Sequence, residues 1–315
     1  MTTLYNRTET NVKTVQIIQE IETRQIGQTK QDHVVSGTYS LKDITTCWAA
    51  AFDGHGTNQA IDIIRNADMN TIMQSDTPHK LLQELIQADS TLQERSRSGS
   101  TMVYAKVTPF ENHTNIEVVN IGDSSALVMV NDKPIFVTTP HNCKNGAEIL
   151  RLITEHRITM QFSIIQMGTT FEVMSPTTVS IKQGLYIRFI DSIGKYYELT
   201  PSQSLGHDGM TGFAPTITNI RVLPSDNVRI FLFSDGVGDV LPTEGLASAS
   251  TFAFMKSVSS TTELLNEAER RWCQEWMCNI EHDTTTQHLS SFESNGYDDC
   301  CCAMMSITPA NIPVL

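Results

Sequence analysis

Residues 47–56, Cys-Trp-Ala-Ala-Ala-Phe-Asp-Gly-His-Gly, join an apolar, strand-like run to an acid, two glycines and a histidine. A strand that ends on a carboxylate and an imidazole is where a metal-dependent hydrolase would place its chemistry. An Asp-Gly pair after a strand is more often a plain turn, because glycine adopts positive φ at no steric cost. The stretch therefore needs support from the rest of the chain.

Three other stretches also place aspartates beside an apolar, strand-like run. Residues 231–236 (Phe-Leu-Phe-Ser-Asp-Gly) end on an acid, residues 298–305 begin with two acids, and residues 31–35 contain Asp32. Strand ends from distant parts of a chain can converge in a sheet sandwich, and clustered carboxylate oxygens suit hard ions such as Mg²⁺ and Mn²⁺. Each acid alone is explained by turn chemistry, but four together favour a metal site.

Six short motifs follow one another along the chain: Gln31-Asp32, Asp53-Gly54-His55-Gly56, Gly99-Ser100-Thr101, Gly122-Asp123-Ser124, Ser234-Asp235-Gly236-Val237-Gly238-Asp239 and Asp298-Asp299. In this order and spacing they resemble the PPM family of metal-dependent serine/threonine protein phosphatases, usually called PP2C. The resemblance extends from about residue 25 to about residue 307, which is nearly the whole chain.

The pattern of apolar residues predicts a mixture of helices and strands without regular βαβ repeats, which is an α+β fold. Strands are expected at residues 13–19, 33–35, 47–52, 101–107, 116–121, 125–130, 135–137, 228–233 and 300–307, and helices at 58–74, 80–95, 146–153 and 261–280. The resemblance implies a four-layer α-β-β-α sandwich with two central antiparallel sheets.

The domain organisation is predicted to be simple, because no convincing linker occurs. Residues 1–10 are expected to form a loose N-terminal tail, and residues 309–315 a C-terminal tail. A single PP2C-like domain is expected over residues 11–308. Within it we expect a variable flap region at 154–209, which has no clear helical period, and a polar surface loop at 281–296.

The resemblance also implies a metal site with two Mg²⁺ or Mn²⁺ ions. Asp53 would bridge both ions, and the Gly54 carbonyl would complete one site, while Asp235 and Asp298 would complete the other. Asp32 would act through metal-bound waters.

The roles of the remaining aspartates in the motifs are less clearly defined by the resemblance. The positions of Asp123 and Asp239 match acids that support a third, weaker metal site in some family members, although Asp123 also suits a hairpin turn. Asp299 is expected to orient Asp298 or to cap the strand.

The chemistry of a phosphate monoester suggests a role for His55. A serine or threonine alkoxide is a poor leaving group, and a protonated imidazole two residues after the bridging acid could act as general acid. With Asp53, His55 is therefore the candidate catalytic residue, and a surface turn histidine is the alternative. Family members usually carry a phosphate-binding arginine where this chain has Gly27, so Arg24 and Lys30 are the candidate replacements.

Composition limits the class of partner. The chain has 315 residues and a formal net charge of −13, which disfavours nucleic acid and anionic membranes as partners. Seven cysteines without any C-x-x-C spacing disfavour a disulfide framework or a zinc site, and residues 300–302 are expected to be buried thiols. We expect a monomer in the cytoplasm, or elsewhere within the cell.

The sequence thus favours a protein serine/threonine phosphatase that hydrolyses phosphoserine and phosphothreonine esters of proteins with a water activated by two metal ions. One alternative is a catalytically inactive module of the same fold that binds phosphoproteins. Retention of Asp53, Asp235 and Asp298 favours the enzyme. A phosphatase that acts on a small phosphorylated metabolite is a second alternative.

Overall fold

Two antiparallel sheets packed face to face form the centre of the computed structural model. The structure describes residues 3–12, 15–27, 29–89, 97–155, 161–190, 194–280, 283–293 and 296–310. The six-stranded sheet has the order β1 (Thr3–Val12), β2 (Val15–Arg24), β18 (Cys300–Pro309), β15 (Val228–Phe233), β8 (Ser125–Val130) and β9 (Lys133–Val137). The seven-stranded sheet has the order β13 (Leu205–Gly206), β5 (Ser98–Ser100), β4 (Ile44–Gly56), β6 (Met102–Pro109), β7 (Thr114–Ile121) and β14 (Thr216–Val222), with β3 (Asp32–Leu41) also paired to β4.

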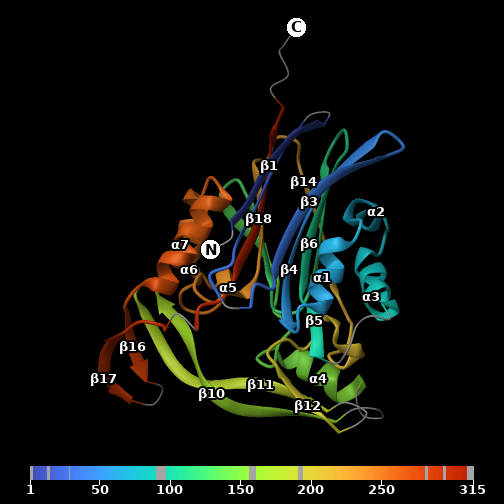
Figure 1. Ribbon diagram of the computed structural model, residues 1–315. Helices are drawn as coiled ribbons and strands as arrows, with labels where there is room; N and C mark the ends of the chain where they lie inside the picture. The colour runs from blue at the N-terminus through green and yellow to red at the C-terminus, as the bar shows by residue number, and fades with distance from the viewer. Residues whose placement is uncertain are drawn as a thin grey trace.

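Helices cover the outer face of each sheet (Figure 1). The seven-stranded sheet is covered by α1 (Gln59–Asn66), α2 (Met69–Met73) and α3 (Pro78–Ala88). The six-stranded sheet is covered by α5 (Asp235–Gly238), α6 (Ser248–Ser257) and α7 (Thr261–Cys273). The predicted α-β-β-α sandwich is confirmed.

Strand β4 shows why the apolar run of residues 47–52 has no polar alternation. Side chains alternate across a strand, so Cys47, Ala49 and Ala51 face the core between the two sheets. Trp48 and Phe52 face the helices instead, where they pack with the core under α1 and α3. Both faces of the strand are buried, and the run is therefore apolar throughout.

The three consecutive cysteines are buried, as predicted. Cys301 faces the core between the sheets, whereas Cys300 and Cys302 face the helix layer of α6 and α7. These thiols therefore act as small apolar strand residues, and burial raises the pKa of each.

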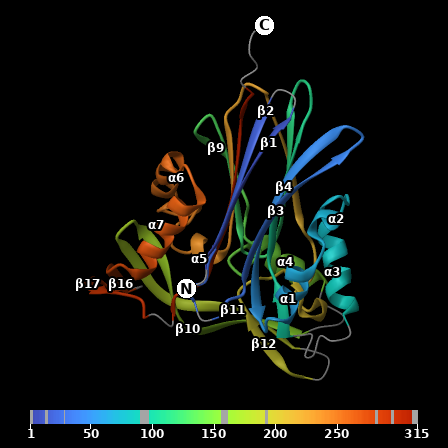
Figure 2. The same ribbon diagram turned by 45° about the horizontal axis from the view of Figure 1, so that its top comes forward.

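A third sheet, not expected from the sequence, lies across one end of the sandwich (Figures 1 and 2). It consists of β10 (Gln161–Ser175), β11 (Thr178–Ile190), β16 (Trp276–Ile280) and β17 (Asp283–Ser290), with β12 (Tyr196–Leu199) paired to β11. We call these five strands the flap sheet. Helix α4 (Gly146–Glu155) packs on it through Leu152, which contacts the core that includes Ile187 and Phe189. Helix α4 confirms the helix expected at residues 146–153.

Three predictions of local structure are wrong. The expected N-terminal tail, residues 1–10, instead forms β1 from Thr3 onward and pairs along its whole length with β2. The expected surface loop at 281–296 contains β17, which pairs with β16. The helix expected at 261–280 ends at Cys273, and the chain continues as strand β16.

The helix expected at 58–74 is divided in two. Asp68 begins α2, because its side chain accepts a hydrogen bond from the Thr71 N–H at 3.2 Å, and Ala67 is extended. The helix expected at 80–95 corresponds to α3, which ends at Ala88, and residues 90–96 lie outside the described residues. In the described part of the chain, no helix is both long and apolar enough to span a bilayer.

Candidate metal centre and substrate cleft

Asp32 and Asp53 lie directly opposite each other at the ends of β3 and β4. The Asp32 carboxylate accepts a hydrogen bond of 2.6 Å from Ser234 Oγ, at the end of β15 in the other sheet. Ser234 Oγ in turn accepts a hydrogen bond from the Cys301 N–H at 3.0 Å. The ends of strands from both sheets are therefore linked beneath the first two acids.

The backbone of Asp53 is held by the two short motifs that contain Thr101 and Ser124. Asp53 donates its N–H to Thr101 Oγ1 at 3.1 Å, and its carbonyl accepts from the Thr101 N–H at 2.8 Å. Thr101 Oγ1 also bonds Ser124 Oγ at 2.6 Å. The sequence assigned no role to these hydroxyls, and only their place in the Gly-Ser-Thr and Gly-Asp-Ser motifs pointed to them.

Asp235 and Asp298 meet where α5 begins and β18 is about to begin. A Cβ on Gly236 would lie 1.9 Å from the Asp299 carbonyl oxygen, so only glycine allows this approach. The Asp299 N–H donates to Asp298 Oδ1 at 2.9 Å, as expected of a residue that orients Asp298.

The Asp299 carboxylate has a second function that sequence reasoning missed. It accepts hydrogen bonds from the Gly27 N–H (2.8 Å), Thr29 Oγ1 (3.1 Å) and the Gln31 N–H (3.2 Å). These bonds fix the loop that leads to Asp32. Asp299 therefore couples the last of the acidic motifs to the first.

The acid cluster, which we define as Asp32, Asp53, Asp123, Asp235, Asp239 and Asp298, is strongly self-repelling. Burial, followed by the charges of neighbouring acids, raises the pKa of Asp32, Asp53 and Asp235 well above the usual range. Burial and the Asp239 charge raise the pKa of Asp123 and Asp298 to about 7. Cations placed among these groups would favour their ionised forms.

The donor set of the acid cluster fits hard divalent ions, because every side chain in it offers oxygen. Asp123 Oδ1 is buried and has no hydrogen-bond partner among the described residues. Within the same residues, no three Asp, Glu, His or Cys side chains are arranged so that they could already hold one ion. The carboxylates are thus gathered at the strand ends.

His55 lies beside the acid cluster. Its Nε2 atom is 3.9 Å from Asp53 Oδ2, and its side chain is only 14% exposed. Neither ring nitrogen of His55 has a hydrogen-bond partner among the described residues, and its ring centroid is 5.9 Å from that of His207. Burial, with a contribution from His207, lowers the pKa of His55 to about 3. A pKa this low leaves the imidazole neutral near pH 7.

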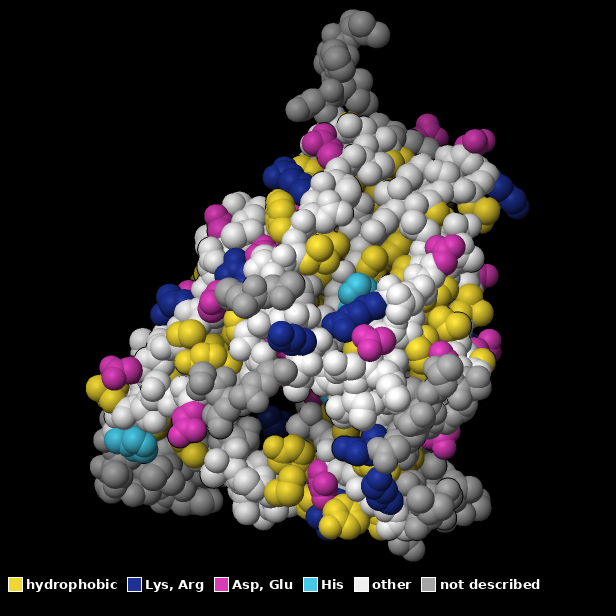
Figure 3. Space-filling model, viewed as in Figure 1, with side chains coloured by type: hydrophobic (Ala, Val, Ile, Leu, Met, Phe, Trp, Pro, Cys, Tyr) yellow, Lys and Arg dark blue, Asp and Glu magenta, His cyan; other side chains and the backbone are white. Residues whose placement is uncertain are grey.

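A cavity of about 640 Å³ separates the acid cluster from the flap sheet. Asp123, Asp235 and Asp239 line one wall, and the opposite wall comes from β10 and β11, including Phe171 and Tyr186. We call this cavity the cleft. Figure 3 shows the molecular surface hollowed between the sandwich and the flap sheet.

The structure does not bring Arg24 or Lys30 to the cleft; neither is among the described residues that line it. Arg24 is buried, and its guanidinium bonds Glu22 and Glu269, each at 2.9 Å. Arg24 therefore joins β2 to α7. Lys30 is exposed, and its carbonyl accepts a hydrogen bond of 2.8 Å from Arg65.

Residues 23–273 match the family described as Protein phosphatase 2C. The chain belongs to the protein phosphatase 2C family. It is 23% identical over 230 residues to a probable protein phosphatase 2C 28 of Arabidopsis thaliana, an alignment that covers 70% of this chain and 59% of that relative. The chain thus spans less than two thirds of that relative's length.

The fold of the chain is similar to that of solved structures. A serine-threonine phosphatase 2C from Toxoplasma gondii matches with a TM-score of 0.53 at 16% identity, over 97% of this chain and 99% of that chain. A sex determining protein of C. elegans matches with a TM-score of 0.50 at 13% identity, over 97% of this chain and 64% of that chain. At these identities the likeness shows the fold alone.

Proposed function

We propose that this protein phosphatase 2C family member is an active protein serine/threonine phosphatase that depends on Mg²⁺ or Mn²⁺. The observation that carries the proposal is the acid cluster at the convergent strand ends, with His55 next to Asp53. The acids include all three carboxylates that the metal-site motifs require, which supports an enzyme over a module that only binds phosphoproteins. Phosphoserine and phosphothreonine proteins are the proposed substrates. A monomeric state and a cytoplasmic location stay predictions.

The proposed metal ligands are Asp53 with the Gly54 carbonyl for one ion, and Asp53, Asp235 and Asp298 for the other. Asp32 would bind through water, and Asp123 with Asp239 would hold a third, weaker ion. When bound, the ions supply a nucleophilic water near neutral pH and offset the charge of the phosphoryl group. Ser234 bonds the Asp32 carboxylate and Thr101 bonds the backbone of Asp53, and these bonds would hold the two acids in place for metal binding.

His55 would donate a proton to the departing serine or threonine oxygen. Burial lowers the pKa of His55, and the negative charge of a bound phosphate dianion would favour the protonated ring. The nearby Asp53 carboxylate, 3.9 Å from Nε2, would help to orient the ring. This role applies only where the leaving group is poor.

The test is the release of phosphate from phosphoserine and phosphothreonine peptides with Mn²⁺ or Mg²⁺, compared with the same assay in EDTA. We expect metal-dependent turnover, and a loss of at least about 1,000-fold for Asp53→Ala or Asp235→Ala, because a metal contributes several kcal/mol to the transition state. Pure wild-type protein without metal-dependent turnover would favour the binding module. Turnover confined to small phosphorylated metabolites would favour the second alternative.

Two substrates in the same assay test His55. His55→Ala should slow hydrolysis of a phosphoserine peptide by roughly 100-fold or more, the usual range for general acid catalysis. An activated aryl phosphate, whose leaving group needs no proton, should be affected far less. Equal losses on both substrates would contradict the general-acid role.

A further inference from the structure

A substrate phosphate needs a cation to bind it. The family resemblance expects an arginine for this role, at a position where this chain has none. Gly27 occupies that place, and its N–H is bonded to Asp299. A Cβ on Gly27 would lie 2.9 Å from the Tyr297 carbonyl oxygen and 3.0 Å from the Asp299 nitrogen. The backbone is thus packed too closely there for any side chain, and Arg24 is already committed to Glu22 and Glu269.

Two lysines are the cationic side chains among the described residues that line the cleft, Lys144 and Lys182. Lys182 lies on β11 of the flap sheet and forms an ion pair with Glu172 of β10. Lys144 is exposed, and its ammonium group forms no ion pair with any residue in the described ranges. Of the two, Lys144 is the one whose charge is available to a ligand.

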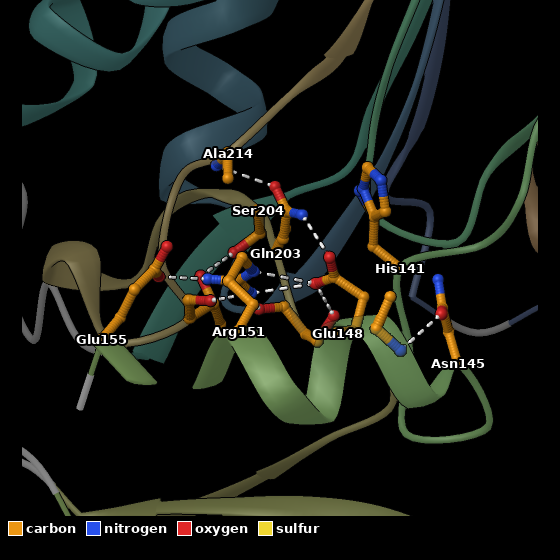
Figure 4. A network of polar contacts seen from close by, with 12 residues as sticks. His141, Asn145, Glu148, Arg151, Glu155, Gln203, Ser204 and Ala214 are labelled. Atoms are coloured by element: carbon orange, nitrogen blue, oxygen red, sulfur yellow. Dashed lines mark hydrogen bonds and ion pairs between the residues drawn. The ribbon is translucent and has the colours of Figure 1, made fainter. Parts of the chain in front are cut away.

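Lys144 is held on a well-anchored turn between β9 and α4. Its N–H donates to Asn142 Oδ1 at 3.0 Å, and the Asn145 side chain bonds the Pro140 carbonyl at 3.2 Å and the Ala147 N–H at 3.1 Å. A chain of hydrogen bonds anchors the start of α4 as well, as Figure 4 shows. In it the Glu148 carboxylate accepts a hydrogen bond from the Gln203 side chain at 2.9 Å. The backbone of Lys144 is therefore fixed before any substrate binds.

Lys144 shares the cleft with the acid wall. Asp239 is exposed and lines this cavity together with Asp123 and Asp235. The turn around Lys144, including Pro140 and Asn142, lines the same cavity. Lys144 therefore lies within one cavity with three of the proposed metal ligands.

We propose that Lys144 binds the phosphoryl group of the substrate in the cleft and supplies the positive charge that Gly27 cannot. The inference rests on the proposed phosphatase function and names a binding residue for it. A lysine ammonium offers three donors as a compact charge on a flexible stem, so it can reach a phosphoryl oxygen without the fixed geometry of an arginine. Its place on the turn between β9 and α4 distinguishes it from a residue of the Gly27 loop.

The test measures binding as well as turnover. Isothermal titration calorimetry in Mn²⁺ would follow a peptide with a hydrolysis-resistant phosphonate in place of phosphoserine, and steady-state assays would give KM and kcat for the phosphopeptide. We expect Lys144→Ala to weaken phosphonate binding and to raise KM by about tenfold, the effect of losing one charge-assisted hydrogen bond. Lys144→Arg should stay within about threefold of wild type, because it keeps the charge.

Lys182→Ala is the matched control, since it removes a lysine from the same cleft whose charge is already paired with Glu172. It should change phosphonate affinity by less than about twofold, as expected of an exposed ion pair. Melting temperatures close to that of wild type would show that both variants fold.

Unchanged affinity and unchanged KM in Lys144→Ala would overturn the proposal. So would equal losses in Lys144→Ala and Lys182→Ala, which would show a general effect of charge in the cleft. A third overturning result is an unchanged phosphonate affinity with altered Mn²⁺ affinity, because Lys144 would then only neutralise Asp239. Wild-type protein that binds the phosphonate through Lys144 but releases no phosphate would instead refute the proposed enzymatic function.

Discussion

The cleft has two walls that are built in different ways. The acid wall is formed by strand ends of the two central sheets, whose side chains are buried on both faces and linked by short hydrogen bonds such as Ser234 to Asp32 at 2.6 Å. The opposite wall is the flap sheet, whose strand β10 exposes the apolar side chains Ile164 and Met167. The first wall can hold charged groups in fixed positions. The side chains of the second wall can differ without moving those groups.

This difference assigns separate tasks to the walls. The chemical groups belong to the acid wall, where a displacement would be transmitted through packed strands. The flap sheet contributes shape and contacts for the substrate, and it is attached through an aromatic cluster. Phe171 of β10 packs edge-on against Trp272 of α7 with ring centroids 5.5 Å apart, and against Phe292 at 4.4 Å. Three changes, in order of decreasing effect, test whether the two walls are separable.

Gly236→Ala should have the largest effect on stability and activity, because Gly236 belongs to the acid wall. The new Cβ would lie 1.9 Å from the Asp299 carbonyl oxygen, which is backbone and cannot move aside cheaply. We expect a loss of about 3 kcal/mol in the free energy of unfolding, at the upper end for overpacking, together with loss of phosphatase activity as Asp235 and Asp298 separate. Urea denaturation and the phosphopeptide assay would measure both.

Gly238→Ala, two residues further along α5, is the matched control. Its Cβ would meet the Phe233 ring at 3.6 Å, an ordinary contact, so stability should stay within about 1 kcal/mol of wild type. Similar losses in the two variants would mean that α5 tolerates no alanine at all, and the close approach at Gly236 would not be the cause.

Divalent ions should have the next largest effect, and their effect should depend on pH. Asp123 and Asp298 have a folded-state pKa of about 7, above their ordinary value of 3.8. Such groups stabilise the metal-free protein below about pH 4, and this contribution is lost as the pH rises through 7. In EDTA the melting temperature should therefore fall between pH 4 and pH 8.

Mn²⁺ should reverse this loss above pH 7, by roughly 2.7 kcal/mol when the free ion exceeds its dissociation constant 100-fold. Thermal melts followed by circular dichroism, with and without Mn²⁺, would measure it. Asp123→Asn should flatten the pH dependence in EDTA. A melting temperature that rises with pH in EDTA, or that Mn²⁺ leaves unchanged at pH 8, would show that the acid wall does not bind ions as proposed.

The acid wall could be predicted from the sequence because its residues follow strands in short, ordered motifs. Asp53, Asp235 and Asp298 each stand at the end of an apolar run, and the sheets then bring those ends together. What the motifs could not reveal was which hydroxyls and amides hold the acids. Such partners lie far away along the chain: Ser234, which bonds Asp32, is 202 residues from it.

The flap sheet was missed because its strands carry misleading or weak patterns. Leu264, Ala268, Trp272 and Trp276 recur every four residues, so the helical period continues past Cys273 although Trp276 is already in strand β16 and packs on the flap sheet. Strand β1 was not predicted, for another reason. It is an exposed edge strand rich in Thr and Asn, and such a strand has no apolar face for a pattern to show.

Arg24 illustrates how proximity in sequence misleads at a strand end. On β2 the residues Glu20, Glu22 and Arg24 alternate onto one face, where Glu20 and Glu22 accept hydrogen bonds from the first residues of α7. The same alternation directs Arg24 toward Glu269 of that helix. A basic residue near the first acidic motif is therefore a structural ion-pair partner, and the phosphate-binding cation that we propose, Lys144, lies on a distant turn.

Phe171→Ala should have the smallest effect on overall stability, because it removes only contacts that attach the flap sheet to the sandwich. Loss of the aromatic contacts with Trp272 and Phe292 should cost about 1 kcal/mol, and the loss should be local. Amide hydrogen exchange should accelerate in β10 and β11 while β4 and β15 keep their protection. Since Phe171 lines the cleft, KM for phosphopeptides should rise a few-fold with kcat retained. A fall in kcat equal to the rise in KM would show that the two walls act as one unit, because the Trp272 side chain also donates a hydrogen bond of 2.7 Å to the Gly236 carbonyl in the acid wall.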